Sequence, residues 1–469
     1  MNKTLLSLLS ILFITLVGMR YNVAILAWLM FVPLLLLIRD TKGFKSWLFI
    51  FGLFQLAYFL QIAKIITDPM PIVMALLFSA PIALGSFILI LLYEKVRIRS
   101  SEIVGIFFFA SLATISEWIS FSSSPLGSWG AMTYTQLGNL PFLQISSLFG
   151  ITLGSFFIYL SSAFIASFIA SKEKKELFKP ALASVLVYLG FYIYGVVRLE
   201  HTQASSTIQV AAIVSDMQIT PKGIPDDKYL EEGTNTLLNN TQIAIDKGAK
   251  IVAWNEGATI IKKEKEKNFI ERVKKLSLEN SVDLVIAYIV PIDGIRKFEN
   301  KYLYIQQGEI QDEYFKYHPV PGEPAIKGEK IAKVQTMNST KISGAICYDF
   351  DFPPLARALS QQDIDIAVVP SSDWKGIDHI HGQMASVRAI EGGFSLIRPV
   401  RASTSYAFDA YGRVRASMDY FEDNSRIMMA TLPTKRVETL YSQVGDIFVY
   451  FLMVFLGIVG ISTLKGRKN

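Results

Sequence analysis

Three side chains in the middle of the chain could do chemistry together, and each follows a predicted β-strand. Glu256 stands in IVAWNEGAT, Lys316 in DEYFKYHPVPGEP, and Cys347, the only cysteine among 469 residues, in ISGAICYDFDFP. A carboxylate can take the proton of a thiol, while an ammonium can lower the pKa of that thiol and stabilise an oxyanion. The thiolate can then attack an acyl carbon and form a thioester. The set is therefore suited to acyl transfer.

Each of the three residues also has an interpretation without chemistry. A lone cysteine on a buried strand more often fills a core, a glutamate after a strand often caps it in water, and a lysine in a hairpin is usually a surface residue. The spacing of the three along the chain does not decide between these interpretations. From the residues alone, both stay open.

The segment that carries these residues, 207–432, alternates strand-like and helix-like stretches. Apolar runs such as TIQVAAIVS and VDLVIAYIV predict buried strands, and YLEEGTNTLLNNTQIAIDKG predicts an amphipathic helix that ends at Gly248. Strands that alternate with helices predict an α/β layered fold, in which chemistry is usually placed where strands open into loops. Residues 321–340 predict an exposed loop that is long enough to cover a binding site.

The rest of the chain is more apolar than a soluble protein. Hydrophobic residues make up 51% of the whole sequence, and they gather outside 207–432. Runs of about 17–25 apolar residues can cross a bilayer as helices, and about eight are present: 4–19, 22–38, 46–66, 71–93, 102–121, 143–170, 180–198 and 446–464. The predicted domains are an N-terminal transmembrane region over 1–200, an α/β catalytic domain over 207–432 and a C-terminal transmembrane helix over 446–464.

Basic residues alternate along the loops between these spans. They follow the second, fourth, sixth and eighth spans: Arg39, Lys42, Lys45; Lys95, Arg97, Arg99; Lys172, Lys174, Lys175, Lys179; Lys465, Arg467 and Lys468. Positively charged loops stay in the cytoplasm, so both termini are expected there and the α/β domain on the outer, periplasmic side of a bacterial inner membrane. Glu117, near the outer end of the fifth span, is either a functional group or a side chain that faces water at the interface.

Composition excludes several kinds of site. One cysteine excludes an intrachain disulfide and a cysteine-based zinc site. The four histidines do not form a metal-ligand pattern. The net charge of +6 is modest and can be assigned to the loops beside the spans, which argues against nucleic-acid binding. We therefore expect neither a metal ion nor another cofactor.

The order and surroundings of the three reactive residues resemble the nitrilase, or carbon–nitrogen hydrolase, superfamily. AWNE is similar to the strand-end glutamate of that family, YFKYHPVPGE to its lysine segment and ICYDFDFP to its nucleophile turn. The likeness continues through PSSDWKGIDHIHGQMASVRAIEGG and YAFDAYGRV. With membrane spans on both sides, the chain most resembles the apolipoprotein N-acyltransferase family. That resemblance covers almost the whole sequence, including SEWISFSSSPLGSWGAMTYTQ and TLYSQVGDIF in the membrane part.

The resemblance implies a nitrilase-like αββα sandwich whose site faces the membrane. It implies that Glu256 is the general base, Lys316 the cation that stabilises the oxyanion, and Cys347 the nucleophile. Substrate-binding residues carried over by motif are Glu323, Tyr348, Asp349 and Trp374. The implied reaction moves an acyl chain from a phospholipid, through a thioester, to the N-terminal amine of a diacylglyceryl-cysteine lipoprotein.

The chain departs from the family pattern around this site. Asn255 replaces a proline, the family's VPFGE is the shorter VPGE around Glu323, and Arg401 stands about where an asparagine is usual. These changes concern donor or acceptor specificity more than the acyl-transfer chemistry. Two other functions therefore stay open: a membrane-tethered amidase or nitrilase, and an inactive paralogue that binds lipid or lipoprotein.

Overall fold

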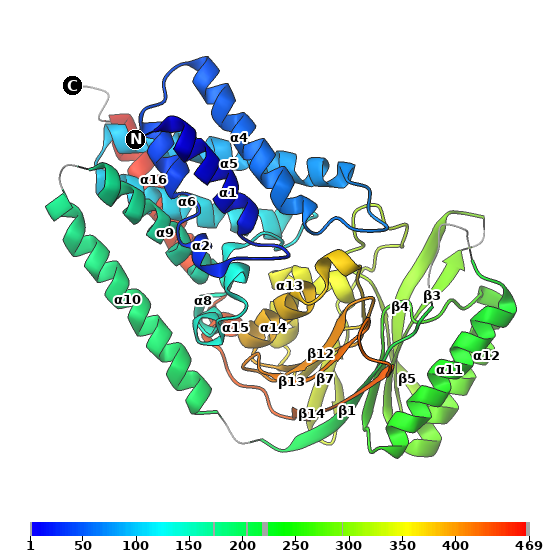
Figure 1. The fold of residues 1–469 in the computed structure, drawn as a ribbon. Coiled ribbons are helices and arrows are strands. Elements are labelled where there is room, and N and C mark those ends of the chain that lie inside the picture. The colour runs from blue at the N-terminus through cyan, green and yellow to red at the C-terminus, as the bar shows by residue number, and fades with distance from the viewer. Residues whose placement is uncertain (1, 172–173, 203–204, 218–223, 293, 466–469) are drawn as a thin grey trace. The chain divides into compact units, whose positions relative to one another are not determined.

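The computed structural model describes residues 2–171, 174–202, 205–217, 224–292 and 294–465. The contacts between residues divide the chain into two compact units. The helical unit comprises Met1–Ser124, Ser128–His201 and Val444–Asn469, and the α/β unit comprises Pro125–Gly127 and Thr202–Gln443. The short segment Pro125–Gly127 thus belongs to the α/β unit, although it comes from the predicted membrane region. Figure 1 shows the elements of both units, coloured along the chain.

The helical unit contains, among the described residues, five helices that are long and apolar enough to cross a membrane. They are α4 (Phe44–Ala63), α5 (Val73–Arg99), α6 (Glu102–Ser123), α9 (Ile151–Ala170) and α10 (Lys174–Glu200). The other helices of this unit are α1 (Lys3–Leu16), α2 (Ala24–Ala27), α3 (Val32–Arg39), η1 (Met132–Gln136), α7 (Leu140–Leu143), α8 (Ser146–Phe149) and α16 (Ile447–Lys465). Helix α15 (Leu440–Val444) spans the point in the chain at which the α/β unit ends and the helical unit resumes.

The helices found over the first two predicted spans, 4–19 and 22–38, are shorter than predicted. The structure contains the 14-residue helix α1 and then two short helices, α2 and α3. The predicted break at residues 20–21 is present but longer than expected, because Gly18, Met19 and Tyr21 all have positive φ angles that a right-handed helix cannot contain. Helix α1 therefore ends at Leu16 and α2 begins at Ala24, and the predicted span 22–38 is divided between α2 and α3. Hydropathy registers the apolar residues of such a segment but not its backbone angles.

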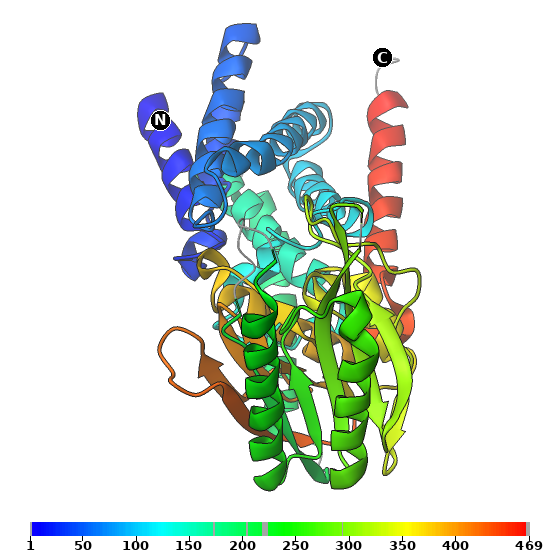
Figure 2. The ribbon, with the colours of Figure 1, turned by 90° about the vertical axis from the view of Figure 1, so that its right-hand side faces the viewer.

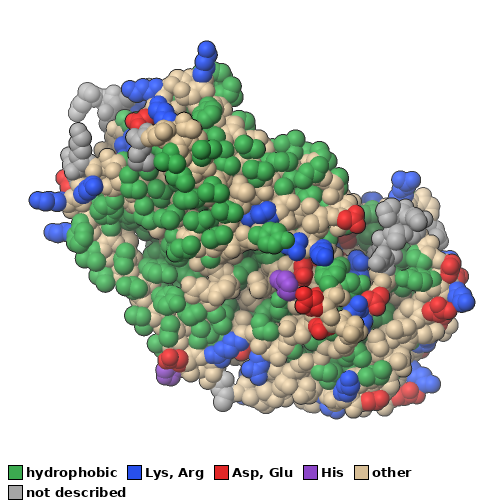
Figure 3. Space-filling model, in the orientation of Figure 1, with side chains coloured by type: hydrophobic (Ala, Val, Ile, Leu, Met, Phe, Trp, Pro, Cys, Tyr) green, Lys and Arg blue, Asp and Glu red, His purple; other side chains and the backbone are tan. Residues whose placement is uncertain are grey.

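The surface of the helical unit is apolar. Large exposed hydrophobic side chains lie on α4, α5 and α10, among them Leu48, Phe49, Leu76, Leu77, Leu186, Val187 and Ile193. In Figure 3, hydrophobic side chains cover much of the drawn face over these helices, whereas charged side chains are frequent over the α/β unit. An apolar surface of this extent is suited to lipid rather than to water.

Basic residues from two of the predicted cytoplasmic loops meet at one end of the helical unit. Arg39, at the end of α3, and Arg97, near the end of α5, both pair with Glu102 at the start of α6. Arg39 also donates to Ser167, near the end of α9. The ends of these four helices therefore lie on the same side, as the alternating charges predict. Lys172, Arg467 and Lys468, which belong to the same charge pattern, lie outside the described residues.

Glu117 faces other groups of the helical unit. Its Oε1 accepts hydrogen bonds from Tyr159 Oη at 2.7 Å and from the backbone N–H of Met132 at 2.9 Å. These contacts tie α6 to α9 and to η1. This carboxylate therefore connects neighbouring elements inside the helical unit.

The α/β unit contains two six-stranded sheets. The first has the order β14-β1-β2-β3-β4-β5 and the second β13-β12-β10-β8-β7-β6, with a small pair β11-β9 beside them. Their bounds are β1 Thr207–Ile213, β2 Ile251–Trp254, β3 Asp283–Ile292, β4 Lys297–Gln306, β5 Glu309–Phe315, β6 Gln335–Met337, β7 Thr340–Gly344, β8 Ile366–Val368, β9 Ser371–Ser372, β10 Ser395–Arg398, β11 Val400–Arg401, β12 Thr404–Phe408, β13 Val414–Asp419 and β14 Ile427–Pro433.

Helices cover the outer face of each sheet. Figure 2 shows α11 (Asp227–Asp246) and α12 (Lys263–Asn280) side by side against the first sheet, and α14 (Ile380–Gly392) packs on the second together with α13 (Pro353–Ser360). Asp226 caps α11 by accepting from the N–H of Tyr229, and Gly248, with φ of 95°, follows its end. The layers are helix, sheet, sheet and helix, which is the αββα sandwich expected for this domain.

The central strands explain why the sheet core is apolar throughout. β1, β2 and β3 are parallel neighbours and are covered on both faces. A core of buried residues runs through them, including Ala211, Ile213, Val252, Trp254, Leu284 and Ile286. Parallel strands that are buried on both faces read as continuous hydrophobic runs, which is the pattern that identified them in the sequence.

The predicted loop 321–340 is attached to the strands of the first sheet. Ala325 forms a β-bridge with Phe298, and the N–H of Gly328 donates to the carbonyl of Lys316 at 2.8 Å. The segment then enters β6, the edge strand of the second sheet. The loop is thus fastened to the first sheet just after Glu323 and to the second sheet at its end.

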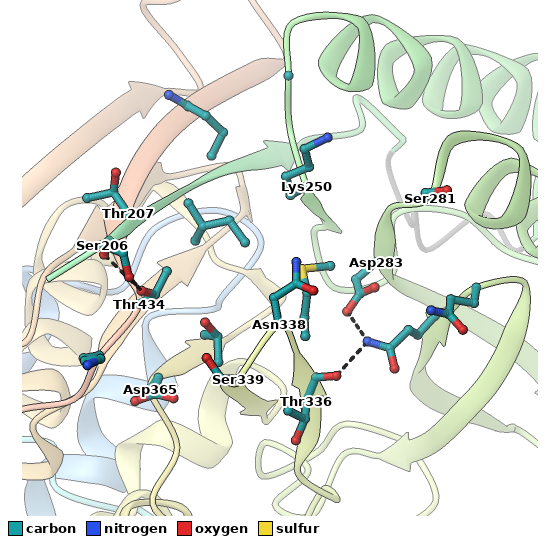
Figure 4. Close-up of a pocket in the computed structure, with 18 of the residues that line it drawn as sticks. Ser206, Thr207, Lys250, Ser281, Asp283, Thr336, Asn338, Ser339, Asp365 and Thr434 are labelled. Carbon is teal, nitrogen blue, oxygen red and sulfur yellow. Dashed lines mark hydrogen bonds between the residues drawn. The ribbon is translucent and has the colours of Figure 1, made fainter.

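A groove of about 1390 Å³ lies at the edge of the α/β unit where its parallel strands begin. Figure 4 shows Thr207, Lys250, Asp283 and Asp365 around this groove. Glu256 and Cys347 follow the other ends of β2 and β7. This groove is therefore at the edge opposite to the predicted reactive residues and is not their pocket.

The groove contains a buried carboxylate that predicts a pH effect on stability. Asp283 is 3% exposed, and its Oδ2 accepts from Tyr304 Oη and from Gln306 Nε2. Burial raises the pKa of Asp283 from 3.8 to about 6, although both hydrogen bonds oppose the shift. Since the folded protein binds this proton more tightly than the unfolded chain, the ionised group destabilises the fold above about pH 6.

We therefore expect Asp283→Asn to raise the free energy of unfolding at pH 7.5 by about 1–2 kcal/mol, which corresponds to a few degrees in melting temperature. The new amide oxygen can still accept both hydrogen bonds. The gain should shrink as the pH falls through 6 and vanish below pH 3.8, where Asp283 is protonated in both states. Thermal unfolding of the full chain in detergent at several pH values measures this, and a gain that is independent of pH would contradict the explanation.

Candidate active site

Glu256, Lys316 and Cys347 meet at the edge where β2, β5 and β7 end. Lys316 Nζ donates to Glu256 Oε1 at 2.8 Å and to Glu323 Oε2 at 2.8 Å. The exposed fractions of the three reactive residues are 6%, 2% and 4%, in chain order. Side chains that are far apart in the sequence thus form one buried group, which a surface cap, a surface lysine and a core cysteine would not do.

The turn that carries Cys347 holds this residue in an unusual conformation. Cys347 begins the short helix η2 (Cys347–Asp351) with a φ of 47°, in the left-handed region that favours glycine. Its N–H donates to the carbonyl of Pro370 at 2.8 Å. Strain of this kind at a residue with a reactive side chain is typical of functional sites.

The charges around Cys347 favour a neutral thiol in the resting protein. Burial raises the pKa of the Cys347 thiol well above its usual value, and Glu256 and Asp373 add to this effect, whereas Lys316 and Arg398 oppose it. Burial alone would lower the pKa of the Lys316 ammonium, but Glu256 and Glu323 raise it well above its usual value. The site therefore combines a lysine held in its charged form with a thiol held in its neutral form.

A second group of charged residues lies behind the thiol, and sequence reasoning missed it. Cys347 Sγ lies 3.8 Å from Asp373 Oδ1 and 3.7 Å from the carbonyl of Ser372. Asp373 in turn contacts His381 Nδ1 at 2.8 Å and Arg398 Nη2 at 3.1 Å. Arg398 is the last residue of β10, and a charged residue that ends an apolar strand was the available signal.

Two aspartates face the ring of His381 and favour its charged form. Burial lowers the pKa of its ring, but Asp351 and Asp373 raise it, to about 9 overall. With Arg398, the ring balances the two aspartates. Cys347, Asp373 and His381 place their ligand atoms within 4.8 Å of one another, which is close enough for a metal ion. Such an ion would have to displace Arg398 from Asp373, so the arrangement favours an ion-pair network.

The four predicted substrate-binding residues differ in their contacts and in their burial. Glu323 reaches the site despite the shortened VPGE, since it contacts Lys316 and accepts the N–H of Val320 at 2.8 Å. Tyr348 donates to the carbonyl of Pro125 at 2.7 Å, and Trp374 is half-buried. Asp349 is completely buried, so its side chain has no face left for a substrate.

Asp349 instead joins the nucleophile turn to the lysine segment. It accepts hydrogen bonds from Tyr314 Oη at 2.8 Å and from the N–H groups of Ile346, Tyr317 and His318 at 3.0, 3.3 and 2.6 Å. Donors from both segments converge on one carboxylate. Both oxygens of the Asp349 carboxylate accept hydrogen bonds, which only an acidic side chain can do at this position. This explains the acidic residue shortly after Cys347.

We expect Asp349→Asn to lower both stability and acylation. Even with its oxygen in the place of Oδ2, the new amide group would turn its NH2 group towards the backbone N–H of His318, at a cost of about 1–3 kcal/mol for the unsatisfied donors. The distance between Cys347 and Lys316 would then no longer be held. Thermal unfolding and the rate of acyl-enzyme formation test this, and unchanged values for both would show that the four hydrogen bonds are unimportant.

Asn300 is a further member of the site that sequence reasoning missed. It lies on β4 and is 2% exposed, and its Nδ2 donates to Glu256 Oε1 at 2.7 Å and to Glu323 Oε1 at 2.9 Å. Its backbone carbonyl accepts from the N–H of Lys316 at 2.9 Å. A polar residue within the alternating pattern of FENKYLYIQ was the signal for a buried functional position.

Two family models match the chain, and between them they cover both units. The model of the apolipoprotein N-acyltransferase N-terminal domain matches residues 10–164. The carbon–nitrogen hydrolase model matches residues 212–441, which include every residue of the site described above except the Pro125 contact. The combination of an N-terminal domain specific to these acyltransferases and a carbon–nitrogen hydrolase domain decides the family. The chain belongs to the apolipoprotein N-acyltransferase family.

Individual proteins agree with this assignment over most of their length. The apolipoprotein N-acyltransferase of Borreliella burgdorferi is 26% identical over 421 residues, which cover 80% of this chain and 77% of that protein. The one from Haemophilus influenzae is 25% identical over 435 residues, which cover 84% of this chain and 80% of that protein. Among solved structures, an amidase from Nesterenkonia sp. matches 53% of this chain and 97% of its own, with a TM-score of 0.44 and 16% identity. The relatives thus match both units of the chain.

The departures from the apolipoprotein N-acyltransferase pattern have local structural explanations. Asn255, in place of a proline, accepts the N–H of Ser215 at 2.8 Å and donates to the carbonyl of Glu256 at 2.9 Å, so it fixes the turn by hydrogen bonds. Arg401 donates to Ser372 Oγ at 2.8 Å. Neither change disturbs the contacts of the Lys316 ammonium.

Proposed function

We propose that this chain is an N-acyltransferase that moves an acyl chain from a phospholipid to the N-terminal amine of a diacylglyceryl-cysteine lipoprotein. One observation carries the proposal: a buried Glu256–Lys316–Cys347 group occurs in a chain whose helical unit matches the N-terminal domain of these acyltransferases. A soluble amide would need no such helical unit. This supports the acyltransferase over a membrane-tethered amidase.

In the proposed first step, Glu256 takes the proton of Cys347 and the thiolate attacks the sn-1 ester carbon of the phospholipid. The negative charge passes to the carbonyl oxygen of the ester, where the Lys316 ammonium and a backbone N–H stabilise it. The C–O bond then breaks, Glu256 returns the proton to the departing oxygen, and a lysophospholipid leaves. The thiol needs this base because burial keeps it neutral.

In the proposed second step, the amine of the lipoprotein attacks the thioester and Glu256 again moves the proton. The burial of the three reactive residues supports a thioester that is shielded from water, with lipid and the 321–340 loop as further cover. Of the predicted substrate-binding residues, we assign Glu323, Tyr348 and Trp374 to the pocket and Asp349 to positioning of the nucleophile turn. No cofactor takes part in this scheme.

We further propose that the chain crosses the bacterial inner membrane about eight times with both termini in the cytoplasm. The transmembrane regions would be 1–200 and 446–464, with the catalytic domain, 207–432, on the periplasmic side. The meeting of Arg39 and Arg97 at one end of the helical unit supports this orientation. Both substrates are lipids, so a site at the membrane surface could receive each of them from the bilayer.

The proposal is tested with purified protein in detergent and a phospholipid that carries a labelled sn-1 acyl chain. We expect label on the protein that hydroxylamine removes, followed by transfer to an added diacylated lipopeptide. Release of ammonia from simple amides without labelling of the protein would favour the amidase. No label at all, with lipid still bound, would favour an inactive paralogue.

A further inference from the structure

The side-chain amide of Asn300 has only one possible orientation. Its two Nδ2 hydrogens are used by Glu256 Oε1 and Glu323 Oε1, at 2.7 and 2.9 Å between the heavy atoms. Turning the amide over would place its oxygen against two carboxylates, which only accept hydrogen bonds when ionised. Its neighbours therefore hold Nδ2 towards the glutamates and Oδ1 away from them.

This orientation leaves Asn300 Oδ1 as a buried acceptor without a donor. Within the part of the chain that the structure describes, no hydrogen-bond partner reaches this oxygen. The residue is 2% exposed. A buried acceptor with no donor is costly, and native proteins satisfy most of them, so one that persists beside reactive groups points to a ligand that supplies the hydrogen.

The position of Oδ1 limits which ligand hydrogen it can serve. The same amide contacts the carboxylate oxygen of Glu256 that also binds Lys316. Oδ1 belongs to the same amide as Nδ2, so one bound amine can place one hydrogen on Oδ1 and another towards the Glu256 carboxylate. The ester group of a phospholipid brings no N–H or O–H to this point, whereas the acceptor amine does.

We propose that Asn300 Oδ1 binds one hydrogen of the attacking primary amine, an inference that rests on the proposed function. The nitrogen lone pair forms the new C–N bond to the thioester carbon. One hydrogen passes as a proton to Glu256, and the other remains on Asn300 Oδ1. The C–S bond then breaks and Glu256 gives the proton to the sulfur of Cys347. The products are the amide and the neutral thiol.

This contact makes Asn300 a specificity residue for primary amines. A primary amine has one hydrogen for Glu256 and one for Asn300. A secondary amine has a single hydrogen, which the reaction needs at Glu256, so Oδ1 would stay unsatisfied throughout the reaction. A site with a buried polar group rejects a substrate that leaves the group unpaired more strongly than a site that only fits its shape.

The test compares two lipopeptides, one with a free α-amine and one whose α-amine carries a methyl group. Each is added to enzyme that already bears a labelled acyl group, and the rate of transfer is measured. We expect the wild type to prefer the primary amine by about 10- to 100-fold more than a small-molecule thioester does in solution. In Asn300→Ala the transfer to the primary amine should fall until this extra preference is lost.

Two controls separate this role from a structural one. Glu323→Gln disturbs the same hydrogen-bonded group but keeps Asn300 Oδ1, so it should slow both amines by the same factor. If the alanine variant does not fold, Asn300→Ser offers a smaller change. The comparison of the wild-type preference for the primary amine with that of a small-molecule thioester in solution needs no variant at all. A wild-type preference equal to that in solution, or a preference that survives in Asn300→Ala, overturns the proposal. Wild type that forms no acyl-enzyme, or transfers to neither amine, overturns the proposed function as well.

Discussion

Replacement of Cys347 by alanine is expected to abolish acyl transfer by at least about 10⁴-fold, since loss of a nucleophile leaves only binding and oxyanion stabilisation. The stability of the protein should change little, because the side chain is small and its contacts with Asp373 and Ser372 are long. The measurement is the amount of labelled acyl chain that the protein takes from phospholipid. We expect no hydroxylamine-sensitive label on the variant and an unchanged melting temperature.

The composition of the chain makes this experiment decisive. Cys347 is the only cysteine of the 469 residues, so a thioester on the wild type can be assigned to it without mapping. Cys347→Ser is the matched control for size. Its hydroxyl is a weaker nucleophile than a thiol and should not accumulate an acyl group. Wild-type rates in Cys347→Ala would refute covalent catalysis at this position.

The sequence could point to the three residues because Glu256 and Cys347 each follow an apolar run that marks a buried strand, and Lys316 follows the second strand of an alternating hairpin. The αββα layers follow from the same alternation of strands and helices. Spacing alone left Glu256, Lys316 and Cys347 unconnected, and resemblance to a family joined them. The structure adds the physical link, because Lys316 Nζ lies 2.8 Å from carboxylates on two other segments.

Other parts of the site could not be predicted because their importance depends on tertiary contacts. Asp373, His381 and Arg398 come from three segments and become a network only when the residues after β9, the start of α14 and the end of β10 come together. Asn300 looks like any polar residue of a half-exposed strand until two glutamates approach it. The first two spans, too, depend on the positive φ angles near Gly18, which hydropathy does not register.

The largest effect on both stability and catalysis is expected from Lys316→Met. The ammonium is 2% exposed and pairs with Glu256 and Glu323. Removing it leaves two buried carboxylates that share the single amide of Asn300, and breaking a buried ion pair in this way costs about 3–5 kcal/mol. For a domain of this size the melting temperature should fall by about 10 °C.

Acylation by Lys316→Met should fall by at least about 10³-fold, because the oxyanion loses its cation and the remaining carboxylates bind protons more tightly. The pH dependence should change accordingly, since Glu256 then acts as a base only at higher pH. Single-turnover acylation at several pH values, beside thermal unfolding, measures both effects.

The double variant Lys316→Met/Glu323→Gln separates charge balance from catalysis. It removes one cation and one anion together, so the buried group regains its net charge and most of the lost stability should return. Acylation should stay as low as in Lys316→Met, because no cation faces the developing oxyanion. If acylation returned along with stability, Lys316 would serve only to neutralise Glu256 and Glu323, and the oxyanion would have to be stabilised by backbone N–H groups alone.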